Sequence, residues 1–91
     1  MAKVKLPTQL RDAAGGSSAV RAGGSTVGEV LEALAGTHPE TRGQLFSGDG
    51  ELNRYVNVYL NDEDVRVLDG LETPVGERDV LVILPAMAGG R

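Results

Sequence analysis

The sequence predicts a small α+β domain in which one amphipathic helix covers one face of a mixed sheet of about four to five strands. One segment, residues 26–36, has apolar side chains at helical spacing, and it is the only such segment in the chain. Short stretches on both sides of it alternate polar and apolar residues or are rich in β-branched residues, as strands are. The length of 91 residues allows one small domain.

Two stretches near the N-terminus predict an antiparallel pair of strands. Residues 3–6 alternate polar and apolar side chains and stop at Pro7, which cannot donate to a ladder. Residues 17–22 alternate more weakly and lie between two Gly-Gly pairs, which are turn signals. We expect residues 8–16 to connect the two strands without regular structure.

The helix has recognisable start and stop signals. Thr26 and Glu29 match a capping box, in which the Thr26 hydroxyl accepts from the Glu29 amide and the Glu29 side chain returns to the Thr26 amide. Gly36 is expected to be the C-terminal cap, and Pro39 prevents continuation. The apolar stripe of the predicted helix consists of Val27, Val30, Leu31 and Leu34.

The polar segment after the helix, residues 37–53, is expected to be a long loop. A short turn near residues 44–46 would bury Leu45 or Phe46 under the domain. His38 is the only histidine, and the chain has no cysteine, so we expect a solvated loop histidine and no metal site.

The next predicted strand covers residues 55–60. Residues 61–64 form an acidic cluster that lacks the ligand spacing of a calcium loop, so a solvated hairpin tip is expected. Residues 65–67 would pair back as a short strand, and Leu71 and Val75 would then reach the core. One face of the predicted strand at residues 55–60 carries Val56, Val58 and Leu60.

Residues 79–84 form the most apolar run and predict a central strand that ends at Pro85. A strand that is apolar on both alternations must be covered on both faces or leave an apolar patch. Because only one helix is predicted, we expect a patch that a partner protein covers.

The chain is expected to consist of a domain, residues 1–84, and a flexible C-terminal tail, residues 85–91. Gly89 and Gly90 lack side chains, so this pair can enter a narrow channel and reach catalytic groups of a partner. A small and polar terminus is also common in proteins where it has no role.

Composition excludes several classes of function. The chain has 9 Lys and Arg against 13 Asp and Glu, and its basic residues are scattered singly, so nucleic-acid binding is not expected. The absence of cysteine excludes disulfides and a sulfur-carrying cysteine. No signal peptide or long apolar run occurs, which predicts a soluble, cytoplasmic protein that does not enter a membrane. We also expect it to be a monomer when free. The sequence shows no nucleophile paired with a general base, so we do not expect the chain to be an enzyme.

Three motifs resemble a known family. They are TVGEVL at residues 26–31, RYVNVYLNDEDVR at residues 54–66 and ILPAMAGG at residues 83–90. Together they resemble the bacterial ubiquitin-like sulfur carriers of the MoaD/ThiS family, in particular the CysO-type carriers of cysteine biosynthesis. The resemblance implies the β-grasp, or ubiquitin-like, fold, in which the first and last strands pair in parallel at the centre of the sheet.

The resemblance also implies a chemical role for the tail. In this family an E1-like adenylating enzyme of the MoeB/ThiF type uses ATP and Mg to adenylate the terminal glycine carboxylate, which here is that of Gly90. A sulfurtransferase supplies sulfur that displaces AMP and leaves a thiocarboxylate. A PLP-dependent cysteine synthase, or another sulfur-accepting synthase, then consumes the sulfur. The chain would be a co-substrate of these enzymes, with no cofactor of its own.

The residues of this predicted site lie in the last strand and the tail. Leu81 and Ile83 would point inward. Enzymes would recognise the tail through Ala88, Gly89 and Gly90, and would dock on Val80, Val82, Leu84 and Met87.

The residue after the Gly-Gly pair departs from the family pattern. Arg91 follows Gly90, so Gly90 has no free carboxylate as the sequence stands. Either a JAMM-type zinc metalloprotease removes Arg91, or Arg91 remains from how the chain was made.

Two other functions fit the same residues. The chain could be a ubiquitin-like protein modifier whose Gly90 is conjugated to lysines, through the same adenylate. It could also be a noncovalent β-grasp interaction module, in which the tail has no role.

Overall fold

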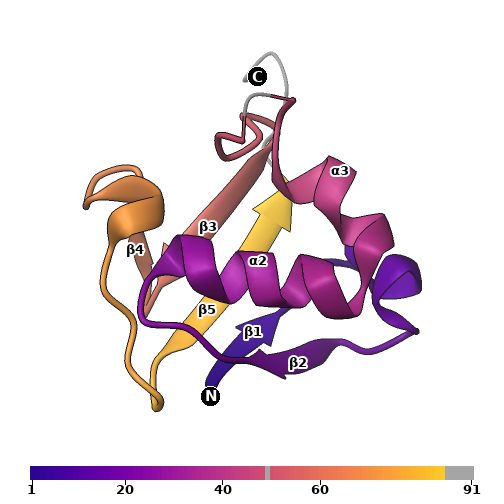
Figure 1. Cartoon of the computed structure of the whole chain (residues 1–91), viewed down its shortest axis with the longest axis horizontal. Helices are drawn as coiled ribbons and strands as arrows, with labels where there is room; N and C mark the ends of the chain where they lie inside the picture. Colours follow the sequence, from indigo (N-terminus) through magenta and orange to yellow (C-terminus); the bar gives the residue numbers. More distant parts are fainter. Residues whose placement is uncertain (49, 86–91) are drawn as a thin grey trace.

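The computed structural model describes residues 1–48 and 50–85, which form a five-stranded mixed sheet with helices on one face (Figure 1). The strand order is β2-β1-β5-β3-β4. The predicted α+β architecture is therefore confirmed. The strands are β1 (Ala2–Lys5), β2 (Ala19–Ala22), β3 (Val56–Leu60), β4 (Glu63–Asp64) and β5 (Val80–Pro85).

β5 lies at the centre of the sheet, as its apolar sequence predicts. It pairs in parallel with β1 and antiparallel with β3. The strand runs one residue further than expected, because Pro85 still pairs with Val56. β1 ends at Lys5, opposite Val82, so on that side Pro85 lies at an open edge, where proline is tolerated.

Helix α2 (Val27–Thr37) crosses one face of the sheet (Figure 1). The Thr26 hydroxyl accepts a hydrogen bond from the Glu29 backbone N–H at 3.2 Å, as predicted. The Glu29 carboxylate instead accepts from the backbone N–H of Ser25 at 2.8 Å, one residue before the expected donor. Both bonds still satisfy donors at the start of the helix.

The predicted C-terminal cap of this helix is wrong. Gly36 lies inside α2, and the C-cap is His38, whose backbone N–H donates to the Leu34 carbonyl. A glycine can continue a helix, although less favourably than alanine. Pro39, by contrast, disfavours helical backbone angles at the residue before it, His38, so the helix ends there. His38 is half-buried at this corner and not in a solvated loop.

Replacing Thr26 by alanine is expected to lower the free energy of unfolding by about 1 kcal/mol, because it removes the N-cap acceptor. Chemical denaturation of both proteins measures the difference. Thr8→Ala is the matched control, since the first turn of α1 (Thr8–Arg11) has no side-chain cap. Equal effects of the two substitutions would contradict a capping role for Thr26.

Several short helices occupy segments that were expected to be irregular. α1 and a 3-10 helix (Asp12–Ala14) replace the predicted connection after β1, and they bury Leu10 and Ala14. A second 3-10 helix (Pro39–Thr41) and α3 (Arg42–Leu45) replace part of the loop after α2. Elements of three or four residues are too short to show helical periodicity in a sequence.

The hairpin after β3 also differs from the prediction. Asn61 and Asp62 have φ of 50° and 77°, which makes a two-residue turn of left-handed residues. The returning strand β4 therefore begins at Glu63 and not at residue 65, while residues 65–67 lie in turns. Val65 is nevertheless buried.

The core lies between α2 and the sheet and is almost wholly aliphatic. Phe46 is its only aromatic member among the described residues, and it and Leu45 are both buried. Val75 is buried, and Leu71 packs against the core at its edge, as expected. In the part of the chain that the structure describes, no helix is long and apolar enough to cross a membrane.

Candidate functional site

The candidate site begins on the side of the sheet that faces away from α2. Along β5, Leu81 and Ile83 are completely buried, whereas Leu84 is 43 % exposed. Val80 and Val82 are half-buried. Successive side chains of a strand point to opposite faces, so the inward and outward assignments made from the sequence are confirmed.

Strand register shows which side chains surround β5 on this open face. Val80 pairs with Lys3, and Val82 pairs with both Lys5 and Tyr59. We use "open face" for the side chains that these pairings place together on the side away from α2. They are Lys3, Lys5, Ala19, Arg21, Asn57, Tyr59, Asp64, Val80, Val82 and Leu84.

A polar clamp holds the start of β5 against the hairpin. The Asn61 side chain donates to the Asp79 carboxylate at 3.1 Å and accepts from the Val80 backbone N–H at 3.1 Å. The Gly76 backbone N–H donates to the other Asp79 oxygen at 2.8 Å. The clamp therefore links the hairpin turn after β3 to the first residue of β5.

The hydrogen bond from the Gly76 backbone, with a second one from Asn61, lowers the pKa of Asp79 below its ordinary value. A depressed carboxyl pKa contributes stability above the unfolded-state pKa of about 4, and this contribution is lost as pH falls through the folded-state pKa.

We therefore expect the stability difference between the wild type and Asp79→Asn to shrink as pH is lowered below about 4. Urea unfolding between neutral and acid pH measures it. Asp69→Asn provides the control, because the Asp69 carboxylate is exposed and forms no hydrogen bond or ion pair with the residues that the structure describes. If the stability difference between the wild type and Asp79→Asn does not vary with pH, the Asp79 carboxylate does not stabilise the domain through these hydrogen bonds.

β5 ends beside a small hollow of about 270 Å³. Pro85 lines this hollow together with Leu10 and Tyr55. The Arg54 guanidinium lies 5.5 Å from the centre of the Tyr55 ring, so a basic group and an exposed aromatic ring stand beside the point where the tail begins. The remaining predicted site residues, Met87, Ala88, Gly89, Gly90 and Arg91, lie outside the described residues.

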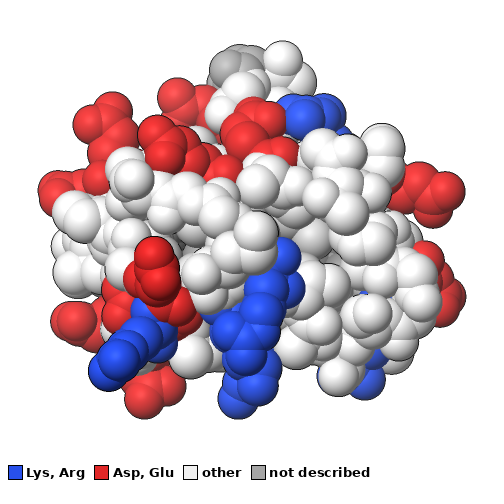
Figure 2. Space-filling view, turned by 60° about the horizontal axis from the view of Figure 1, so that its bottom comes forward, with Lys and Arg blue, Asp and Glu red and all other residues white. Residues whose placement is uncertain are grey.

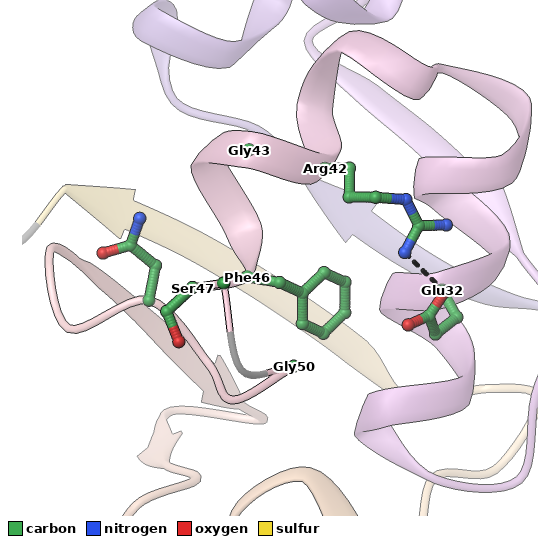
Figure 3. A pocket seen from close by; sticks show the side chains of 8 residues that line it. Glu32, Arg42, Gly43, Phe46, Ser47 and Gly50 are labelled. Carbon is green, nitrogen blue, oxygen red and sulfur yellow. Dashed lines mark hydrogen bonds and ion pairs between the residues drawn. The ribbon is translucent and has the colours of Figure 1, made fainter.

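A second hollow, of about 550 Å³, lies among α2, α3 and the loop that follows (Figure 3). Arg42 forms an ion pair with Glu32 at 2.9 Å, and its guanidinium lies 6.0 Å from the Phe46 ring centre. Both charged side chains are about half exposed, at 51 % and 55 %. The paired charges lie on the helix side of the sheet, on α2 and α3.

Among residues 1–48 and 50–85, no group of three or more His, Asp and Glu side chains could hold a metal ion. The acidic hairpin tip at residues 61–64 is instead divided between the turn and β4.

The sequence did not indicate which side chains lie beside the apolar row of β5, which consists of Val80, Val82 and Leu84. Lys3, Lys5 and Tyr59 belong to the open face only because β1 and β3 flank β5 in this register. The sequence also did not predict the clamp formed by Asn61 and Asp79. Its one local signal was an Asn-Asp pair at a hairpin tip, since both residues tolerate left-handed backbone.

The comparisons with known proteins agree over almost the whole chain. Residues 4–90 match the ThiS family. The chain is 44 % identical over 89 residues to sulfur carrier protein CysO of Mycobacterium tuberculosis, which covers 96 % of each chain. It is 39 % identical over 89 residues to small archaeal modifier protein 1 of Haloferax volcanii, covering 94 % and 97 %.

A solved structure shows the same fold. A chain of the Amycolatopsis orientalis BexX/CysO complex superposes with a TM-score of 0.89 at 43 % identity, and the match covers 99 % of this chain and 100 % of that one. The predicted β-grasp fold is confirmed by this likeness.

Proposed function

This chain belongs to the ThiS family, and we propose that it is a sulfur carrier protein that holds sulfur as a thiocarboxylate on Gly90. One observation carries the proposal, namely that the family match runs from residue 4 through Gly90 and so includes the Gly-Gly pair. The position of β5 supports it, because a strand held on both sides by neighbours leads directly into the tail.

The proposed chemistry takes place on the Gly90 carboxylate. A carboxylate oxygen attacks the α-phosphate of ATP, pyrophosphate leaves, and an acyl adenylate forms. Sulfur, delivered as the equivalent of hydrosulfide, then attacks the carbonyl carbon and AMP leaves with the bonding electrons. The products are the thiocarboxylate and a proton, and the domain itself supplies no catalytic group.

The enzymes that act on the carrier belong to the proposal. They are an E1-like adenylating enzyme of the MoeB/ThiF type with ATP and Mg, a sulfurtransferase, and a PLP-dependent cysteine synthase or another sulfur-accepting synthase. The similarity to a chain of the BexX/CysO complex supports docking of the folded domain on a partner protein.

Activation at Gly90 requires a free carboxylate, so the Gly90–Arg91 peptide bond must first be cut. We propose that a JAMM-type zinc metalloprotease makes this cut. Gly-Gly-Arg suits such a step, because a chain without side chains at Gly89 and Gly90 can enter a narrow protease channel.

Conjugation to proteins is the second candidate, and the 39 % identity to a small archaeal modifier protein favours considering it. Both functions begin with the same adenylate and differ in whether sulfur or a lysine amine attacks it. Peptides in which Gly90 is linked to a lysine side chain, found in digested host lysate, would support conjugation.

The intact mass of the protein after incubation with host extract, ATP and sulfide tests the carrier function. We expect loss of one arginine and replacement of one oxygen by one sulfur. An unchanged mass, under conditions in which a CysO carrier is converted, would favour a noncovalent interaction module.

A further inference from the structure

β1 and β5 separate at the end of the sheet where the tail begins. β1 pairs with β5 only as far as Lys5 and Val82, whereas β3 continues to pair with β5 as far as Pro85. A hollow of about 430 Å³ lies where the chain turns from β1 into α1. Leu84 and Pro85 line this hollow together with Lys5 and Arg11. The last described residue before the tail is therefore part of its wall.

Two cations line the hollow. Lys5 is exposed at the end of β1, and Arg11 is exposed in the last turn of α1. The Arg11 Nε–H donates to the Leu6 carbonyl at 3.2 Å, which leaves the terminal guanidinium nitrogens to other acceptors. Neither cation forms an ion pair within residues 1–48 and 50–85, where Arg42 is paired with Glu32. Both positive charges are therefore available to an anion.

The rest of the chain carries negative charge. The formal net charge is −4, so subtracting the two positive charges of Lys5 and Arg11 leaves −6 on all other residues. Figure 2, which brings the β1 and β2 side forward, shows Lys and Arg side chains mostly in its lower half and many Asp and Glu side chains around the rim. An anion near the domain is therefore repelled by much of the surface and attracted to its few cationic positions.

The end of this chain is long enough to reach the hollow. Once Arg91 is removed, five residues follow Pro85, and a segment of this length spans at most about 18 Å. Because Pro85 itself lines the hollow, the Gly90 carboxylate can reach both cations. Gly89 and Gly90 have no side chains that would obstruct the approach. A short covalent link also gives the carboxylate a local concentration of the order of millimolar.

We propose that this hollow is a resting site for the chain's own terminal carboxylate, or for the thiocarboxylate formed from it, and that Lys5 and Arg11 hold the anion. The inference rests on the proposed function, because Gly90 carries this anion only after Arg91 is cut off. Before the cut, the Arg91 guanidinium places a positive charge beside the terminal carboxylate, and the two cations repel it. An enzyme that activates Gly90 must first withdraw its carboxylate from the hollow.

Cross-linking with a water-soluble carbodiimide tests the contact, because this reagent joins a carboxylate to a nearby amine with loss of one water. The sequence has two lysines, Lys3 and Lys5, on the same face of β1. In the chain that ends at Gly90, we expect the Gly90–Lys5 bond to form at least about fivefold more often than Gly90–Lys3, since Lys3 lies about 7 Å further from the hollow. Peptide mass spectrometry after proteolysis measures both bonds.

Arg11→Gln tests the second cation, because glutamine keeps a side-chain donor for the Leu6 carbonyl but carries no charge. We expect the Gly90–Lys5 cross-link to fall about threefold. Arg78→Gln is the matched control, since Arg78 is an exposed cation just before β5, at the opposite end of the strand from the tail. It should change the cross-link by less than about 1.5-fold. Circular dichroism checks that both variants are folded.

The chain that keeps Arg91 provides a further comparison, and its terminal carboxylate should cross-link to Lys5 about threefold less. Equal cross-linking to Lys3 and Lys5, equal effects of Arg11→Gln and Arg78→Gln, or no gain on removal of Arg91 would each overturn the inference. So would cross-links found only between two molecules. These measurements use no activating enzyme. If the Gly90–Lys5 bond forms but host extract never removes Arg91 or adds sulfur, the proposed function fails instead.

Discussion

Replacing Gly90 by alanine is expected to reduce thiocarboxylate formation about a hundredfold, which is the cost of a misplacement of about 1 Å at a reacting centre. A methyl group on the terminal residue would displace the carboxylate from the ATP α-phosphate inside a channel that fits glycine. The buried core of the described residues ends at Ile83, so we expect the free energy of unfolding to stay unchanged. Intact mass after a timed reaction and chemical denaturation provide the two measurements.

Gly36→Ala is the control for this experiment, because it makes the same chemical change away from the tail. A Cβ at Gly36 would meet no atom within 4 Å, and the residue lies inside α2. This substitution should raise stability by about 0.5–1 kcal/mol and leave thiocarboxylate formation as in the wild type. Normal sulfur loading of the Gly90→Ala protein would refute the idea that the tail enters a narrow channel.

Replacing Ile83 by alanine is expected to lower the free energy of unfolding by about 2–5 kcal/mol. The Ile83 side chain is completely buried in the central strand, so its removal leaves a cavity under α2. Small domains are stable by only about 5–15 kcal/mol, and this loss is therefore a large part of the total. Urea unfolding followed by circular dichroism measures it.

Substitution of the next residue along β5, Leu84, should affect partner binding more than stability. Leu84 is 43 % exposed on the open face, so Leu84→Glu should change stability by only about 0.5 kcal/mol. It should weaken binding of the activating enzyme about tenfold or more, because a carboxylate would have to be buried in an apolar contact. Unchanged enzyme affinity for Leu84→Glu would show that docking uses another surface.

Much of the fold could be predicted because its main elements carry strong local patterns. Residues 55–60 alternate cleanly, and residues 79–84 are apolar throughout, so their roles as a half-covered strand and a central strand followed from the sequence. The start of α2 followed from Thr26 and Glu29. For the candidate site, the resemblance to the family implied that Val80, Val82 and Leu84 face away from the core, and the burial pattern of β5 agrees with this.

Where local patterns were weak, the prediction failed. Gly36 continues α2 because tertiary burial of the preceding turn outweighs the small preference of glycine for a cap. β4 begins at Glu63 because the left-handed Asn61 and Asp62 close the turn in two residues. α1 and α3 each have only four residues, and packing of Leu10 and Leu45 into the core holds them in place.

The sequence by itself determined the class of fold, the residues that face the core and the Gly-Gly tail on which the proposed function depends. These features are local, since they follow from side-chain period, capping and the absence of side chains at Gly89 and Gly90. Only the tertiary structure decided what surrounds the apolar row of β5. Lys3 and Arg21 are 18 residues apart in the chain, and the pairing of β1 with β2 and β5 places Lys3 between Arg21 and Val80, because strand register joins segments that no local pattern connects.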